Sequence, residues 1–74
     1  MNRVPNPGDK ISLETGDATV FEVRQRYGDV TILAGRDHPF HPFATWKWDP
    51  HNGALYAGRY FERLADAEVD YDQR

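Results

Sequence analysis

The sequence predicts a mainly β fold of the α+β class, in which a small, twisted, antiparallel five-stranded sheet is followed by one C-terminal α-helix. Segments in which polar and apolar residues alternate recur as far as residue 58, as in strands that bury one face. Turns that contain glycine or proline separate these segments, and short turns join neighbouring antiparallel strands. Beyond residue 59, apolar residues follow one another at intervals of three and four, which is the spacing of an amphipathic helix.

The first two strands follow a proline-rich start. Residues 1–8 contain two prolines and a glycine, so we expect a flexible, extended lead-in. Residues 9–13 alternate polar and apolar side chains as a first strand, and residues 18–26 are rich in β-branched and aromatic residues as a second. We expect Phe21 and Val23 to face the core, although the apolar residue before Phe21 leaves this register open by one position.

Three further strands are expected in the middle of the chain. Residues 30–34 alternate as a third strand, and two prolines in the next segment, 35–42, disfavour both helix and central strand there. Residues 43–48 alternate again and form the fourth strand. The sequence Asp-Pro-His-Asn-Gly at 49–53 is typical of a hairpin turn, so we expect residues 54–58 to return as the fifth strand.

The C-terminal segment is expected to be helical over about residues 60–71. Four apolar side chains there are spaced by four, three and four positions, as on one stripe of a helix. They are Tyr60, Leu64, Ala67 and Tyr71.

Residues 9–74 are therefore predicted to form a single small-barrel domain. Short strands joined by tight turns give a strongly twisted sheet that curls into a partial barrel. In strand number and spacing this architecture resembles an SH3-like small barrel with an added C-terminal helix, but no family motif accompanies the likeness. A flat sheet with the helix packed across one face is the alternative.

Composition excludes several classes of protein. The chain has 74 residues, enough for one domain, and it contains no cysteine, which excludes disulfides and thiolate metal sites. No run of 18 apolar residues is present, so we expect no membrane-spanning segment. The first residues lack the apolar stretch of a signal peptide. We expect a cytoplasmic protein that does not act on membranes.

The net charge of −3 comes from the end of the chain. Residues 1–60 contain seven acidic and seven basic side chains, whereas residues 61–74 contain five acidic and two basic ones. Overall acidity argues against nonspecific binding of nucleic acid, although a neutral barrel leaves room for a locally basic face. The acidic helix is itself a candidate surface for a basic partner, or a mimic of nucleic-acid charge.

Patterns for catalysis and metal binding are weak. The single serine, Ser12, lies in an expected edge strand, and no nucleophile motif is present. His38, His41 and His51 lie near one another beside two aspartates, and imidazole and carboxylate groups suit zinc or nickel. These histidines occupy proline-broken loops without a marked fourth ligand. We expect no catalytic activity, metal or cofactor; a small metal-dependent enzyme that uses the histidine loop is the alternative.

Aromatic residues are the most informative feature. Seven of the ten lie between positions 40 and 61, and a small core cannot bury all of them unless the helix covers the remainder. We expect Trp46 and most of Tyr60 and Phe61 in the core, and other rings at a groove near basic side chains. The candidate binding residues are Phe40, Phe43, Trp48, Tyr56, Arg24, Arg36 and Lys47.

These observations predict a non-catalytic interaction module that binds a protein or peptide partner, or forms a homodimer, through an aromatic surface. The alternative is single-stranded nucleic-acid binding, in which bases stack on the rings while Arg and Lys contact phosphates. Salt distinguishes the two, because affinity for nucleic acid falls steeply as salt rises, whereas a mainly apolar protein interface is nearly indifferent to salt.

Overall fold

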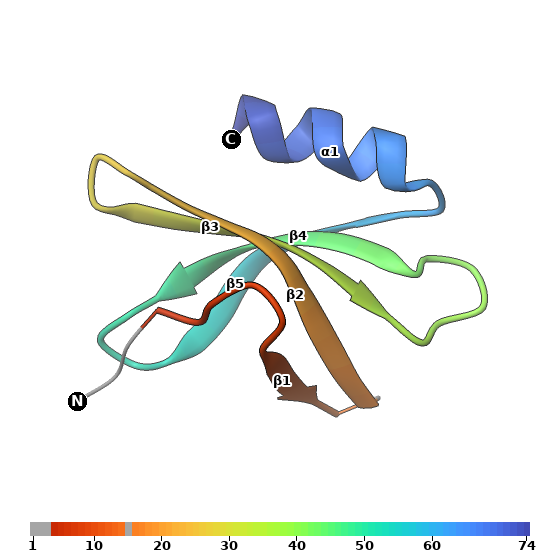
Figure 1. The fold of residues 1–74 in the computed structure, drawn as a ribbon, viewed down its shortest axis with the longest axis horizontal. Coiled ribbons are helices and arrows are strands. Elements are labelled where there is room, and N and C mark those ends of the chain that lie inside the picture. The colour runs from red at the N-terminus through yellow and green to blue at the C-terminus, as the bar shows by residue number, and fades with distance from the viewer. Residues whose placement is uncertain (1–3, 15) are drawn as a thin grey trace.

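A computed structural model describes residues 4–14 and 16–74, which form a curled, five-stranded antiparallel sheet and one C-terminal helix (Figure 1). The predicted fold class, mainly β with one terminal helix, is confirmed, and the curled half-barrel is consistent with an SH3-like small domain rather than a flat sheet. The elements are β1 (Lys10–Leu13), β2 (Gly16–Arg26), β3 (Asp29–Arg36), β4 (Phe43–Asp49), β5 (Ala54–Phe61) and α1 (Leu64–Gln73).

The strands form a meander in which each strand pairs with the next one along the chain, in the order β1-β2-β3-β4-β5. Two tight hairpins explain why these neighbouring strands pair. Tyr27 and Gly28 between β2 and β3 both have positive φ, 53° and 83°, as a type I′ turn requires. Between β4 and β5, the amide of Gly53 donates to the carbonyl of Asp49 at 2.7 Å.

One face of the sheet, which we call the concave face, carries the larger core. Alternate residues of β2, β3 and β4 point there and are buried, with Ile32 at the centre and Trp46 beside it, as expected from their spacing. The segment before β1 lies across this face (Figure 1). Val4 packs against the core, and the amide of Gly8 donates to the carbonyl of Val20 over 2.8 Å. Of the predicted lead-in, residues 1–3 lie outside the described residues.

The opposite face, which we call the helix face, carries α1 (Figure 1). The helix packs against β3, β4 and β5. Leu33 from β3 and Ala67 and Tyr71 from α1 form a second buried cluster, with Phe43 and Phe61 packed against it. A single curled sheet therefore supports two apolar clusters, one on each side.

The helix begins later than predicted, because α1 starts at Leu64 and not at residue 60. Tyr60 and Phe61 instead extend β5, where they pair with Ala44 and Phe43. The predicted stripe fails at its first member because Tyr60 also satisfies the two-residue period of the strand before it. Tyr60 is half exposed, and its ring meets that of Trp46 edge to face on the concave side.

The prediction that Phe21 faces the concave core is wrong. Val20 pairs with Ala34 and Glu22 pairs with Leu33, so Phe21 is an extra residue in β2, a β-bulge. The bulge lets Val20 and Val23 both pack on the concave core, as Val23 was expected to do. Phe21 is directed to the other side of β2, where its side chain remains 40% exposed.

Candidate functional site

A groove runs along the helix face between α1 and β2. Because α1 packs against β3, β4 and β5, the neighbouring part of β2 stays uncovered. A hollow of about 310 Å³ lies between α1 and β2, and a second of about 410 Å³ adjoins it between β2, β3 and the loop before β4; Phe21 lines both of them. We call them together the Phe21 groove. Its shape depends on the bulge, which places two consecutive side chains, Phe21 and Glu22, on the helix face, whereas in a regular strand Glu22 would return to the concave face with Val20.

The smaller hollow lies between β2 and the first half of α1. Its apolar lining comes from Phe21, Leu33 and Leu64. Leu33 is buried at its base, whereas the Leu64 side chain is 38% exposed. Glu22 on β2 and Glu68 on α1 also line the hollow, so each of the two bordering elements contributes an acidic residue beside the apolar ones.

The larger hollow continues past Phe21 toward the loop that precedes β4. The rings of Phe21 and Phe43 have centroids 6.4 Å apart and are tilted by 50°. The Phe21 ring lies directly against Gly35, since a Cβ at Gly35 would come within 2.3 Å of Phe21 Cζ. Glycine at this position therefore leaves room for the end of the Phe21 ring. Charged residues surround this hollow: Lys10, Asp17, Arg36 and Asp37.

Acidic side chains outnumber basic ones around the Phe21 groove. Across both hollows, the acidic lining residues are Asp17, Glu22, Asp37 and Glu68, and the basic ones are Lys10 and Arg36. The guanidinium of Arg36 lies over the Tyr60 ring, 4.5 Å from its centroid, and its Nε donates to the His41 carbonyl. The charge around the groove is therefore net negative.

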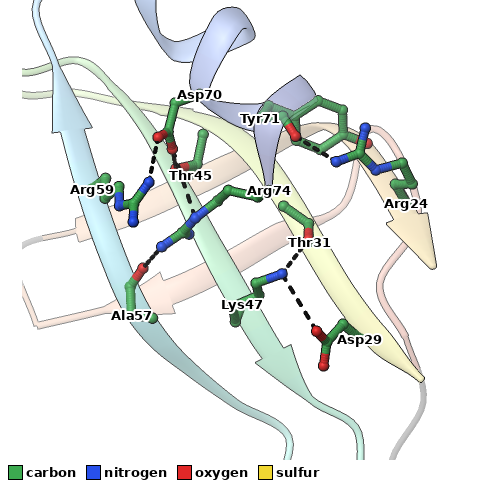
Figure 2. Close-up of polar contacts among 10 residues, drawn as sticks. All are labelled: Arg24, Asp29, Thr31, Thr45, Lys47, Ala57, Arg59, Asp70, Tyr71 and Arg74. Carbon is green, nitrogen blue, oxygen red and sulfur yellow. Dashed lines mark hydrogen bonds and ion pairs between the residues drawn. The ribbon is translucent and has the colours of Figure 1, made fainter. Parts of the chain in front are cut away.

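A polar network fixes the second half of α1 and so positions one wall of the groove (Figure 2). Asp70 accepts hydrogen bonds from Thr45 Oγ1 at 2.5 Å and Arg59 Nη1 at 2.6 Å, and Arg74 Nε lies 3.7 Å away. Burial raises the pKa of the Asp70 carboxyl, but these hydrogen bonds and the two arginine charges outweigh burial and leave the pKa below its usual value. Arg74 also donates to the carbonyl of Ala57.

Two of the predicted binding cations hold the fold together instead of lining the groove. Arg24 Nη2 donates to the Tyr71 carbonyl at 2.6 Å, and its guanidinium lies 4.8 Å from the Tyr71 ring centroid (Figure 2). A cation at the last turn of a helix offsets the negative end of its dipole. Burial raises the pKa of the Tyr71 hydroxyl. Lys47 Nζ donates to Thr31 Oγ1 at 3.1 Å and lies 3.8 Å from Asp29.

The seven predicted binding residues do not meet on one surface. Phe43 lies in the Phe21 groove, and Arg36 lies at its border. Trp48 packs on the concave core, and Tyr56 is half exposed on β5, opposite Lys47 in the register. Phe40 is 70% exposed in the loop before β4, with its ring 6.2 Å from that of His38.

Several groove residues had no place in the predicted binding set, namely Phe21, Glu22, Leu33, Leu64 and Glu68. One sequence signal could have indicated Phe21. Val20 and Phe21 are adjacent large apolar residues, and in a regular strand adjacent side chains lie on opposite faces. The exposed member of such a pair is a candidate contact residue on the face opposite the main core.

The histidine loop makes backbone contacts. His38 Nδ1 accepts hydrogen bonds from the amides of Phe40 at 3.2 Å and His41 at 2.9 Å, so this nitrogen helps to close the loop. His51 lies in the β4–β5 turn, where its amide donates to the Asp49 carboxylate. Over residues 4–14 and 16–74, no three His, Cys, Asp or Glu side chains come together as a potential metal site.

Within the same described ranges, no helix has the length and apolar character needed to cross a membrane. Comparison of the chain with protein family models, curated proteins and solved structures finds no match.

Proposed function

We propose that this protein is a non-catalytic interaction module that binds a segment of another protein in the Phe21 groove. The observation that carries the proposal is the position of Phe21, a large ring that is 40% exposed between two adjoining hollows. Aromatic side chains in such positions supply much of the binding energy of protein interfaces. The neighbouring apolar residues Leu64 and Phe43 provide further contact area for a partner.

The form of the groove suits a peptide segment better than a small metabolite. Both hollows are open features of the helix face, of which the smaller borders α1, and they share the ring of Phe21. A partner that places one apolar side chain on each side of Phe21 would contact both hollows at once. Two-point contact of this kind gives a short segment both affinity and register.

Single-stranded nucleic acid is disfavoured as the occupant. Arg24 and Lys47 are engaged in contacts that hold α1 and β3, so neither is available to follow a phosphate backbone. The groove lining is net negative, and nucleic-acid binding needs local positive charge. We therefore propose binding through an aromatic surface, as the sequence predicts, but at the Phe21 groove on the helix face.

The test is selection of random 12-residue peptides displayed on phage against the wild-type protein, followed by affinity measurement on variants. We expect selected peptides to bind at least tenfold more weakly to Phe21→Ala, because truncation of a central ring in an interface costs about 2 kcal/mol or more. Tyr27→Asn is the matched control, since Tyr27 is an aromatic residue that is 98% exposed in the β2–β3 turn.

Peptides that bind wild type and Phe21→Ala equally would refute the proposal. So would an oligo(dT) 20-mer that binds wild type and loses affinity on Phe21→Ala. Phe43→Ala is a poorer probe, because Phe43 also packs against the cluster beneath α1 and its removal would change stability. Thermal unfolding of each variant verifies that it is folded before affinity is compared.

A further inference from the structure

The charges around the Phe21 groove specify its partner further. We infer that the bound segment carries basic side chains next to its apolar ones, so that Lys or Arg residues pair with Glu22 and Glu68 while apolar side chains contact Phe21. This inference rests on the proposed peptide-binding function and identifies the class of peptide.

Glu22 and Glu68 lie on opposite borders of one apolar hollow. Glu22 comes from the bulge in β2 and Glu68 from α1, and between them are the apolar side chains of Phe21, Leu33 and Leu64. A segment bound there therefore meets apolar surface with a carboxylate on each side. Covering the hollow removes water from both carboxylates, and an ionised carboxylate that loses water without gaining a partner is costly. A cationic side chain at each border avoids that cost.

Neither carboxylate has a cationic partner within the part of the chain that the structure describes. Other acidic residues of the helix face differ in this respect, since Asp70 is paired with Arg59 and Asp29 lies near Lys47. Other acidic residues in the described ranges, among them Glu62, Asp66 and Asp72, also lack an ion pair, but only Glu22 and Glu68 border the smaller apolar hollow. Complementary charge of this kind raises association rate and selects partners.

Neither of the two basic residues that line the larger hollow lines the smaller one. Lys10 and Arg36 line the larger hollow together with Asp17 and Asp37, which leaves that part of the groove balanced. The excess negative charge therefore belongs to the Glu22 and Glu68 end. The position of a basic residue in a bound segment should follow this asymmetry, at the end that lies beside α1.

A second copy of this chain is a poor occupant. In a symmetric dimer the same patch contacts itself, so two pairs of glutamates would come together and repel. Several of the chain's own cationic side chains already have partners. Arg24 contacts Tyr71, Arg59 and Arg74 contact Asp70, and Lys47 contacts Asp29. A separate basic and apolar segment satisfies the groove without these conflicts.

The experiment compares phage-selected 12-residue peptides on the wild type, on Glu22→Gln/Glu68→Gln, on Phe21→Ala and on Asp66→Asn. Asp66 is the matched control, because it lies two residues before Glu68 on α1 and so points to a different side of the helix. We expect the selected peptides to contain Lys or Arg next to aromatic or branched apolar residues. Removal of both carboxylates should weaken their binding by about 4- to 25-fold at low salt, given a typical two- to fivefold effect for each exposed charge pair.

The outcomes separate this inference from the proposed function. Selected peptides that lack basic residues, or that bind the double Gln variant as well as wild type, overturn the inference while loss on Phe21→Ala still supports peptide binding. Equal binding to wild type and Phe21→Ala overturns both. A wild-type dimer in sedimentation that dissociates on Phe21→Ala would make a second copy the occupant and also overturn the inference. Retained affinity on Asp66→Asn and a steeper salt dependence for wild type than for the double variant support it.

Discussion

Replacement of Asp70 with Asn removes the negative charge at the centre of the polar network that holds α1 on the sheet. Asp70 accepts hydrogen bonds from Thr45 and Arg59 and lies beside Arg74. The Asp70 and Arg74 side chains are only 14% and 7% exposed. The substitution keeps the size of the side chain and one acceptor oxygen, so its effect reports mainly the charge and not the packing.

The expected loss of unfolding free energy is about 2–4 kcal/mol. A hydrogen bond to a charged group contributes about 1.5–3 kcal/mol, and Asn keeps only one of the two hydrogen bonds that Asp70 accepts from Thr45 and Arg59. Arg59 adds little to this sum, because its side chain is 58% exposed and exposed pairs contribute about 0–1 kcal/mol. Arg74 adds more, since its buried guanidinium loses its counter-charge. For a domain of this size, total stability is about 4–11 kcal/mol, so the loss is a large fraction.

The effect depends on pH in a defined direction. The pKa of Asp70 in the folded protein lies below the ordinary value of 3.8, so the ionised carboxylate stabilises the fold at every pH above about 4, the unfolded value. That stabilisation is lost as the pH falls through the lower folded pKa. The difference between wild type and Asp70→Asn should therefore be constant from about pH 5 to 8 and shrink below about pH 4.

Urea unfolding at pH 7 and at pH 3, followed by tryptophan fluorescence, measures the loss of unfolding free energy and its dependence on pH. The melting temperature at pH 7 should fall by roughly 8–30 °C, at about 4–8 °C per kcal/mol for a small domain. Asp72→Asn is the matched control, an exposed carboxylate two residues further along α1, and should change stability by less than about 0.5 kcal/mol. A loss below about 0.5 kcal/mol for Asp70→Asn, or one that is equal at both pH values, would refute the role given to the network.

Two further predictions concern backbone geometry. Tyr27→Asn should raise stability by about 0.5–1 kcal/mol in urea unfolding. Tyr27 has a φ of 53° and is almost fully exposed, and Asn tolerates that conformation better in a type I′ turn. A loss of stability would contradict this, because it would mean that the Tyr27 side chain makes stabilising contacts. Gly35→Ala should destabilise by about 1–3 kcal/mol, because the new Cβ meets the Phe21 ring. In a Phe21→Ala background the same change should cost much less, and equal costs in both backgrounds would contradict the close contact between ring and glycine.

The arrangement of strands followed from local patterns, because each strand pairs with its neighbour in the chain. In β3 and β4, the alternation that places Ile32 and Trp46 on one face could be determined from the sequence, since the pleat fixes a period of two. The hairpin at 49–53 followed from its turn residues in the same way. These features need no knowledge of distant partners, which is why the sequence alone was sufficient for them.

Two errors have a common cause in pairing between strands. Whether Phe21 faces in or out depends on the bulge opposite Leu33, and the bulge is defined only once β2 and β3 are paired. Whether Tyr60 starts a helix or ends a strand depends on its pairing with Ala44. Local spacing fits both alternatives at each position, so the sequence could not decide between them.

The candidate site was harder to predict than the fold, because a site depends on which side chains remain available after packing. Arg24 and Lys47 are cations near aromatic residues in the sequence, and nothing local shows that Arg24 contacts the last turn of α1 or that Lys47 contacts Thr31. Conversely, Glu22 and Glu68 are far apart in the chain and become neighbours of one hollow only through the fold.

The anchoring of α1 is uneven, and this bears on how the groove works. Its last turns are held by Arg24, Asp70 and Arg74, whereas its first residue follows Arg63, which forms no side-chain capping hydrogen bond. An uncapped helix start is less stable than a capped one by about 1 kcal/mol. Leu64 and Glu68, which border the Phe21 groove, belong to this less anchored half. The polar network thus holds the helix on the sheet from its far end, and the wall that a partner contacts, which includes Leu64 and Glu68, lies outside this network.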